Sequence, residues 1–190
     1  MRKISVLEMF EELNELTQKA IYFGEALKNL NHAQLNYKPE PEVWSVYECL
    51  EHLNLYGDHY LKEIENTLKT NKIEKPADYF KGGFLGNYFV KIIRPANGHI
   101  KKMKTAKDMN PISGNLNELT LSRFISQQKK LLTLLNNSKD YNLQKIKIST
   151  TLSQFINLSL GDTLRFVVYH NERHLVQASE ILHKANITVA

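Results

Sequence analysis

The sequence predicts an all-α protein, a four-helix bundle with a long irregular crossover between its second and third long helices. Three observations support this prediction. Apolar residues recur every three or four positions in four long stretches, strand-like alternation is scarce, and most prolines and glycines fall between these stretches. The 190 residues are enough to bury one core, so we expect a single domain over residues 1–190.

The first two long helices are expected at residues 5–30 and 45–68. In the first, Val6, Phe10 and Leu13 begin an apolar stripe at three-four spacing. The prolines of NYKPEPEVW, residues 36–44, then force an extended connection, because proline disfavours helix in the residue before it. Ser45 and Glu48 form a Ser-x-x-Glu capping box, which marks the start of the second helix.

Residues 71–115 make up the crossover, in which we expect a short helix over residues 84–93. The third long helix is expected at residues 116–137. The fourth is expected at residues 160–185, with Ser159 or Asp162 as its cap. Between these two, KIKISTTL at residues 145–152 alternates like a strand. Since an isolated strand has no partner, we interpret it as extended or irregular.

Charge and cysteine content narrow the class of protein. The net charge is +5, and six Lys or Arg residues lie between Lys91 and Lys107 with no acid among them. That segment lacks interleaved aromatic residues and known nucleic-acid-binding motifs, so a solvated loop is a better interpretation than a nucleic-acid-binding surface. The single cysteine, Cys49, is expected in the core and fits a reducing compartment. No apolar run is long enough to span a membrane and no signal peptide is recognisable, so we expect a cytoplasmic protein.

Two histidines stand four residues apart in VVYHNERHLVQASEIL, residues 167–182. On a helix, His170 and His174 project side by side from one face, at the border of the apolar stripe. They are then close enough to share one metal ion. The spacing alone is weak evidence, because two of seven histidines often fall four apart. The alternative is a pair of partly exposed imidazoles bonded to neighbouring side chains.

The second helix offers a third histidine, His52, also at the border of an apolar stripe. His59 lies two turns further, about 10 Å along the axis, so both cannot readily bind one ion. Three neutral imidazoles with an open position form a known catalytic metal arrangement, and His52 could meet the other pair across a helix contact. On the same edge, His59 is left as a pocket residue and Glu63 is a candidate general base on spacing alone. Three further histidines are expected on the surface: His32, His99 and His183.

Two motifs carry a resemblance to a known family. Trp44, Ser45, Glu48 and His52 read W-S-x-x-E-x-x-x-H, and the fourth helix carries H-x-x-x-H extended to Gln177. With these motifs, most of the chain resembles the DinB/YfiT-like family of four-helix-bundle proteins, to which metal-dependent enzymes are assigned. In that family one histidine of the second helix and two of the fourth bind the metal. The resemblance therefore implies a divalent ion on His52, His170 and His174.

The same resemblance implies a metal-dependent hydrolase or a small-molecule thiol S-transferase, in which the ion activates water or a thiol. Zinc or nickel is expected, although imidazole ligands also suit iron and copper. The expected partner is a small-molecule substrate such as a thiol, and a homodimer could form through flat apolar helix faces. One alternative is a non-catalytic metal-binding or stress-response module. Another is a structural bundle that uses the basic segment as its contact surface.

Several side chains near the histidines could have either a catalytic or a structural role. Tyr56 is the candidate catalytic residue, donating a hydrogen bond to a bound ligand, but it could equally be a core aromatic. Glu48 could act as a base, although the capping box competes for it. Glu172 is a candidate base on spacing alone, but it is expected to point away from the site into solvent. Arg173 could steer an anionic substrate, although a salt bridge on the outside is the favoured expectation. Trp44 is expected to close the end of the bundle as a packing anchor.

Overall fold

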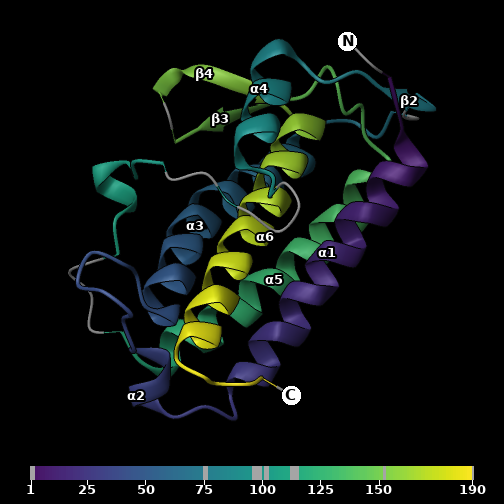
Figure 1. Ribbon diagram of the computed structural model, residues 1–190. Coiled ribbons are helices and arrows are strands. Elements are labelled where there is room, and N and C mark those ends of the chain that lie inside the picture. Colours follow the sequence, from purple (N-terminus) through teal and green to yellow (C-terminus); the bar gives the residue numbers. More distant parts are fainter. Residues whose placement is uncertain are drawn as a thin grey trace.

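The computed structural model describes residues 3–74, 77–95, 100, 103–111, 116–151 and 153–189. It confirms the all-α four-helix bundle (Figure 1). None of the helices described is long and apolar enough to cross a membrane. The cytoplasmic location and the pairing of two copies stay predictions. The four bundle helices are α1 (Val6–Leu27), α3 (Val46–Thr70), α5 (Glu118–Ser138) and α6 (Leu160–Lys184).

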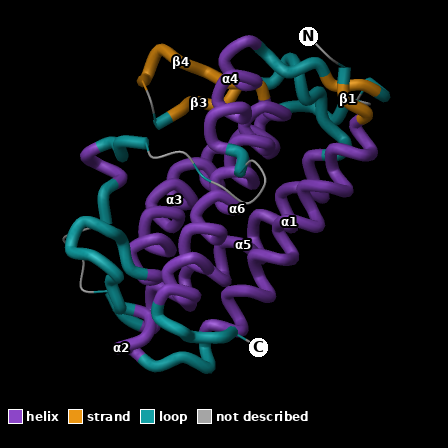
Figure 2. The backbone as a smooth tube through the Cα atoms, viewed as in Figure 1, coloured by secondary structure: helices purple, strands orange, loops and turns teal. Residues whose placement is uncertain are grey.

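The helices are not arranged in the order of the chain. Both α1 and α3 pack against α5 and α6, so α1 and α3 lie on a diagonal of the bundle (Figure 2). In Figure 1, α1 and α6 run down the bundle whereas α3 and α5 run up it. Because α3 and α5 are parallel neighbours, the chain must return along the whole bundle between them. This return is the long crossover that the sequence predicts.

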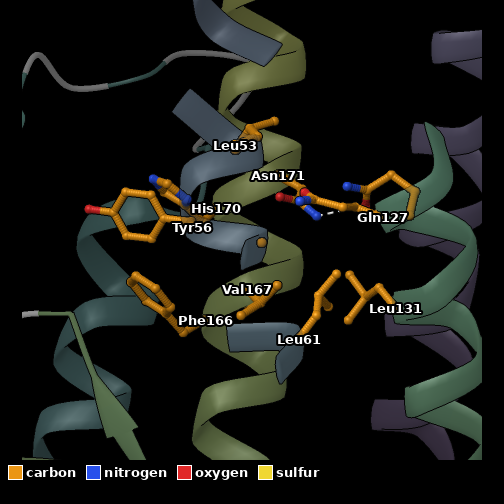
Figure 3. Close-up of a pocket in the computed structure, with 11 residues that line it drawn as sticks. Leu53, Tyr56, Leu61, Gln127, Leu131, Phe166, Val167, His170 and Asn171 are labelled. Atoms are coloured by element: carbon orange, nitrogen blue, oxygen red, sulfur yellow. Dashed lines mark hydrogen bonds between the residues drawn. The ribbon is translucent and has the colours of Figure 1, made fainter. Parts of the chain in front are cut away.

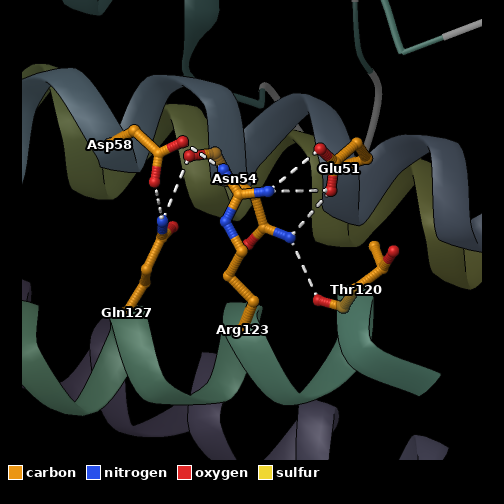
Figure 4. A network of polar contacts seen from close by, with 6 residues as sticks. All are labelled: Glu51, Asn54, Asp58, Thr120, Arg123 and Gln127. Atoms are coloured by element: carbon orange, nitrogen blue, oxygen red, sulfur yellow. Dashed lines mark hydrogen bonds and ion pairs between the residues drawn. The ribbon is translucent and has the colours of Figure 1, made fainter. Parts of the chain in front are cut away.

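A polar network joins the parallel helices α3 and α5 (Figure 4). Arg123 of α5 reaches two acids of α3, Glu51 at 3.0 Å and Asp58. The Asn54 amide, fully buried, donates to the carbonyl oxygen of Thr120 at 3.0 Å. Since Glu51 and Asn54 flank His52 in sequence, the network fixes the part of α3 that carries the candidate ligand.

Helix starts follow the predicted capping signals. Ser45 and Glu48 form both bonds of the capping box, with the Ser45 N–H donating to Glu48 Oε2 at 2.7 Å. Ser159 caps α6 by accepting from the Asp162 N–H at 3.2 Å. The crossover holds the expected short helix α4 (Phe84–Ile93) and a 3₁₀ turn, η1 (Lys107–Met109). A further short helix, α2 (His32–Leu35), lies just after α1.

The interpretation of residues 145–152 as unpaired was wrong. Strand β3 (Lys147–Thr150) pairs in antiparallel fashion with β4 (Ser153–Ser159), which continues directly into α6. A second pair joins β1 (Ile4–Ser5) to β2 (Tyr79–Phe80). The β3–β4 hairpin packs on α3, where the Tyr60 hydroxyl lies 3.3 Å from Thr151 Oγ1. Leu152 lies outside the described residues.

The core consists of two apolar clusters stacked along the bundle, one around Tyr60, Leu131 and Leu164 and the other around Leu50, Phe124 and Ala178. Buried polar side chains lie between them. They include three histidines and an amide pair in which Asn171 Nδ2 donates to Gln128 Oε1 at 2.7 Å. The candidate site therefore lies in a polar layer at mid-bundle. The buried polar residues of this layer include His52, Asn54, Gln128, His170, Asn171 and His174.

Candidate metal centre

The structure brings the three predicted ligands together. His52 of α3 and His170 and His174 of α6 each offer a ring nitrogen, and these three atoms lie within 4.8 Å of one another. Among them, His52 Nε2 lies 3.3 Å from His170 Nε2. Exposed fractions of 2%, 7% and 7% show that all three side chains are buried. The alternative, a pair of partly exposed imidazoles, is therefore wrong.

Helix geometry explains why these residues meet. His170 and His174 are one turn apart and share a face of α6. Because α3 passes α6 in the opposite direction, one residue of α3 can face both of them. The capping box at Ser45 sets where α3 begins and hence which turn carries His52.

Two of the three rings form a hydrogen bond through Nδ1. His52 Nδ1 lies 2.7 Å from the carbonyl oxygen of Met109, in the 3₁₀ turn of the crossover. His174 Nδ1 lies 3.0 Å from Gln177 Oε1, one turn further along α6. Neither partner was expected from the sequence. The i,i+3 spacing of His174 and Gln177 could have indicated the second, whereas nothing local in the sequence indicates Met109.

Aromatic rings enclose the three imidazoles. The Trp44 indole lies 4.9 Å from the His52 ring and 5.7 Å from the His174 ring, measured between centroids. Tyr56 lies 4.4 Å from the His170 ring, and Phe166 stacks on that ring at 5.5 Å. Trp44 thus covers the site rather than only closing the bundle end. These rings restrict the side-chain rotamers of the histidines and exclude water.

A small cavity lies on the core side of His170, between α3, α5 and α6 (Figure 3). Leucine and valine side chains form much of its wall, including Leu53, Leu131 and Val167. Figure 3 shows Tyr56 and Phe166 on the same side of the cavity as His170. Because an apolar wall solvates charge poorly, it disfavours the imidazolium form of His170.

The pKa values of all three histidines lie below the usual value, mainly because burial penalises the charged ring. The pKa of His52 falls to about 4, although the hydrogen bond to Met109 partly opposes the fall. The pKa values of His170 and His174 are also well below 6.5. The nearby positive charge of Arg173 lowers all three further. At neutral pH the rings are therefore uncharged, the form in which imidazole binds metals.

The donor set fits a divalent metal ion. Structural and catalytic zinc sites hold imidazole nitrogens at about 2.0–2.1 Å in tetrahedral geometry, which places two such nitrogens about 3.3 Å apart. The separation of His52 Nε2 and His170 Nε2 is 3.3 Å. Three nitrogen ligands leave at least one coordination position for water or a substrate atom.

Other predicted residues lie away from the three rings. The Glu48 carboxylate completes the capping box and pairs with Lys38 at 2.8 Å, so it is not aimed at the site. Cys49 is fully buried, and burial raises the pKa of its thiol. His59 lies 3.1 Å from the carbonyl oxygen of Ser149, on the side of α3 that holds the hairpin. His32 and His183 are exposed as expected, whereas His99 lies outside the described residues.

Two expectations about the fourth helix need correction. Arg173 is 6% exposed rather than on the outside, because phase on one helix does not show what other segments cover. Glu172 does face away from the histidines, toward Glu12, Lys19 and Arg94, but it is half-buried and burial raises its pKa. The basic segment is also not simply a free loop, since Arg94 pairs with Glu12.

Comparison with known proteins shows the family of this chain. Residues 15–178 match the sequence profile of the DinB superfamily. The chain belongs to the DinB superfamily. The chain is also similar to YuaE from Bacillus subtilis (strain 168), an uncharacterized protein. The two sequences are 23% identical over 159 residues, which cover 83% of this chain and 89% of YuaE.

The fold of this DinB-superfamily protein also matches a solved structure. YfiT from Bacillus subtilis is described as a probable metal-dependent hydrolase with an unusual four-helix bundle topology. The two structures superpose with a TM-score of 0.54 and 15% sequence identity, over 96% of this chain and 89% of YfiT. At this identity the likeness shows a shared fold. The diagonal placement of α1 and α3 in this chain is one departure from a simple up-and-down bundle.

Proposed function

We propose that this protein is a metal-dependent hydrolase whose divalent ion is held by His52, His170 and His174. The observation that carries the proposal is the meeting of three buried, uncharged imidazoles within 4.8 Å. A divalent ion bound by three such ligands polarises substrate oxygens and lowers the pKa of a bound water toward neutrality. The description of YfiT as a probable metal-dependent hydrolase supports the proposal.

Tyr56 is the residue best placed to assist the reaction. Its ring lies beside both His52 and His170, at 5.0 and 4.4 Å. Burial and, to a smaller extent, Tyr60 raise the pKa of its hydroxyl, and a hydrogen bond with Thr151 opposes part of this rise, so the hydroxyl keeps its proton at neutral pH. It can therefore donate a hydrogen bond to a substrate oxygen while the histidines hold the ion.

Thiol transfer is the second candidate function. The three acids that the sequence offered as bases are all engaged elsewhere: Glu48 in the helix cap, Glu63 with the Ser149 hydroxyl at 2.6 Å, and Glu172 toward α1. Water attack benefits from such a base, whereas a thiol loses its proton on binding the metal. The orientation of these acids thus favours a small-molecule thiol as an alternative nucleophile at the same site.

The first test is metal content of untagged protein, compared with a variant in which all three histidines are changed to alanine. We expect close to one equivalent of metal in the parent protein and none in the folded variant. Ester and amide hydrolysis are then assayed with and without added low-molecular-weight thiol. Thiol-dependent consumption of substrate would select the transferase. A parent protein that takes up no zinc or nickel even after incubation would refute both functions.

Removing the hydroxyl of Tyr56 separates catalysis from metal binding. In Tyr56→Phe the ring contacts with the histidines remain, so we expect the metal affinity to stay within about twofold. Loss of one hydrogen-bond donor to the reacting oxygen lowers kcat by roughly 100-fold. Side-by-side metal titration and turnover measurements check this. Equal losses in both would show that Tyr56 only supports the fold.

A further inference from the structure

We infer that Gln177 and the backbone carbonyl of Met109 are positioning groups that fix the tautomers of His174 and His52. Each accepts a hydrogen bond from Nδ1 of its histidine, so that the lone pair of both rings is on Nε2, the nitrogen left to bind a metal. The inference deepens the proposed function, because it rests on a metal bound by these rings. It assigns a role to two groups outside the ligand set.

For His52 the tautomer follows from the chemistry of its partner. A neutral imidazole has one N–H donor and one acceptor nitrogen, and a backbone carbonyl can only accept. At 2.7 Å from the Met109 oxygen, His52 Nδ1 must therefore carry the proton. The lone pair is then on Nε2, the atom that lies 3.3 Å from His170 Nε2.

For His174 the tautomer depends on which end of the Gln177 amide faces the ring. The carbonyl oxygen Oε1 lies 3.0 Å from His174 Nδ1, and it requires the proton on that nitrogen. The opposite amide orientation would donate to Nδ1 and place the proton on Nε2, which would block metal binding there. In the orientation that the structure shows, the half-buried Gln177 therefore selects the tautomer of His174 that leaves Nε2 able to bind a metal.

The two acceptors come from different parts of the fold. Gln177 is one turn from His174 on α6, so helix geometry alone presents it. Met109 is 57 residues from His52 and lies in the crossover. A metal on Nε2 makes the Nδ1–H a stronger donor, so metal binding and the seating of this crossover turn stabilise each other.

The test uses Gln177→Leu and Gln177→Glu in the full chain. Leucine removes the acceptor, and we expect a 10–100-fold loss of zinc affinity in competition with a chromophoric chelator. Glutamate still accepts from Nδ1, so affinity is expected to stay within about threefold or rise. Gln18→Leu, an exposed glutamine of α1, is the matched control and should change nothing. Unchanged affinity in Gln177→Leu would overturn the inference.

Nitrogen NMR of the histidine rings in metal-free protein gives a second readout, independent of metal. We expect His52 and His174 to carry their protons on Nδ1 in the parent protein. In Gln177→Leu only His174 should move toward the Nε2-protonated form, which a merely structural role would not produce. An Nε2-protonated His174 in the parent protein would refute the inference. This outcome is distinguishable from failure of the proposed function, which is a parent protein that binds no metal.

Discussion

Trp44 gives the candidate site its own spectroscopic probe. It is the only tryptophan in the chain, and its indole lies 4.9 Å from the His52 ring and 5.7 Å from the His174 ring. Nickel, with an open d shell, quenches indole emission at such short range. We expect tryptophan fluorescence to fall on adding nickel and to level off at one equivalent.

A fluorescence titration measures this, with the triple alanine variant of His52, His170 and His174 as the control. In that variant the emission should be insensitive to stoichiometric nickel. A loss of emission that is the same in both proteins would mean that nickel reaches Trp44 without binding the three rings. The expectation of a distinct site would then be wrong.

Side-chain roles were predictable where helix spacing or a motif decides them. The shared face of His170 and His174 follows from i,i+4 spacing, the Glu48 cap from its box, and the burial of Cys49 from helical phase. The metal-binding role of the histidines came instead from the family resemblance. The burial of Arg173 was not predictable, because phase on one helix gives no information about segments that cover it. The Met109 carbonyl escaped prediction for a related reason, since it reaches His52 from a distant segment.

At the scale of elements, α4 is seated on α6 through a buried carboxylate. Asp162 accepts from the Gly83 N–H at 2.8 Å and from Ser159 Oγ at 2.8 Å. Arg165 links the same carboxylate to Asn87 of α4. This seat also supports the site, because Phe89 of α4 contacts Phe166, which stacks on His170.

The contacts of Asp162 with α4 predict that alanine substitutions at two neighbouring glycines differ in their effect on stability. A Cβ on Gly86 would lie 2.1 Å from Asp162 Cγ, whereas a Cβ on Gly83 would meet its nearest atom, Asp162 Oδ2, at 3.2 Å. We expect Gly86→Ala to lower the free energy of unfolding by about 1–3 kcal/mol, as overpacking does. Gly83→Ala should lie within about 0.5 kcal/mol of the parent. Urea unfolding of both variants checks this, and equal effects would show that α4 is not seated through Asp162.

Long elements were predicted better than short ones. The helices follow from a local period of three to four residues, and α4 was expected with the bounds that the structure has, Phe84–Ile93. Strand β3 showed its alternation but not its partner, because β4 shows no clear alternation and runs straight into α6. Strands β1 and β2 have two residues each, too few for any periodic pattern. Pairing between strands is non-local, so local patterns fail there.

At the scale of the whole molecule, the site joins segments that are far apart in the chain. His52 lies on α3, His170 and His174 lie on α6, and the crossover reaches His52 through Met109. The parallel run of α3 and α5 makes the crossover long enough to return past this layer. An ion bound to the three rings would therefore link α3 directly to α6 and, through His52, the crossover. The topology brings the ligands together, and a bound ion would in turn hold these segments in place.

Keeping three rings uncharged inside the bundle makes stability depend on pH. The folded-state pKa of His52 is about 4 and those of His170 and His174 are also well below the usual 6.5. As the pH falls through 6.5, the unfolded chain takes up protons at these rings and the folded protein does not. Stability is therefore fully present above about pH 6.5 and is lost as the pH falls toward the folded-state values.

Between pH 7.5 and 5.5 the expected loss in metal-free protein is about 1 kcal/mol for each of the three histidines. Urea unfolding at the two pH values measures it, in a window above the range where most carboxylates titrate. A variant with glutamine at positions 52, 170 and 174 cannot titrate there and should lose much less. Equal losses in the two proteins would show that the rings are charged or solvated when folded. Such rings would not present the neutral nitrogens that a metal needs.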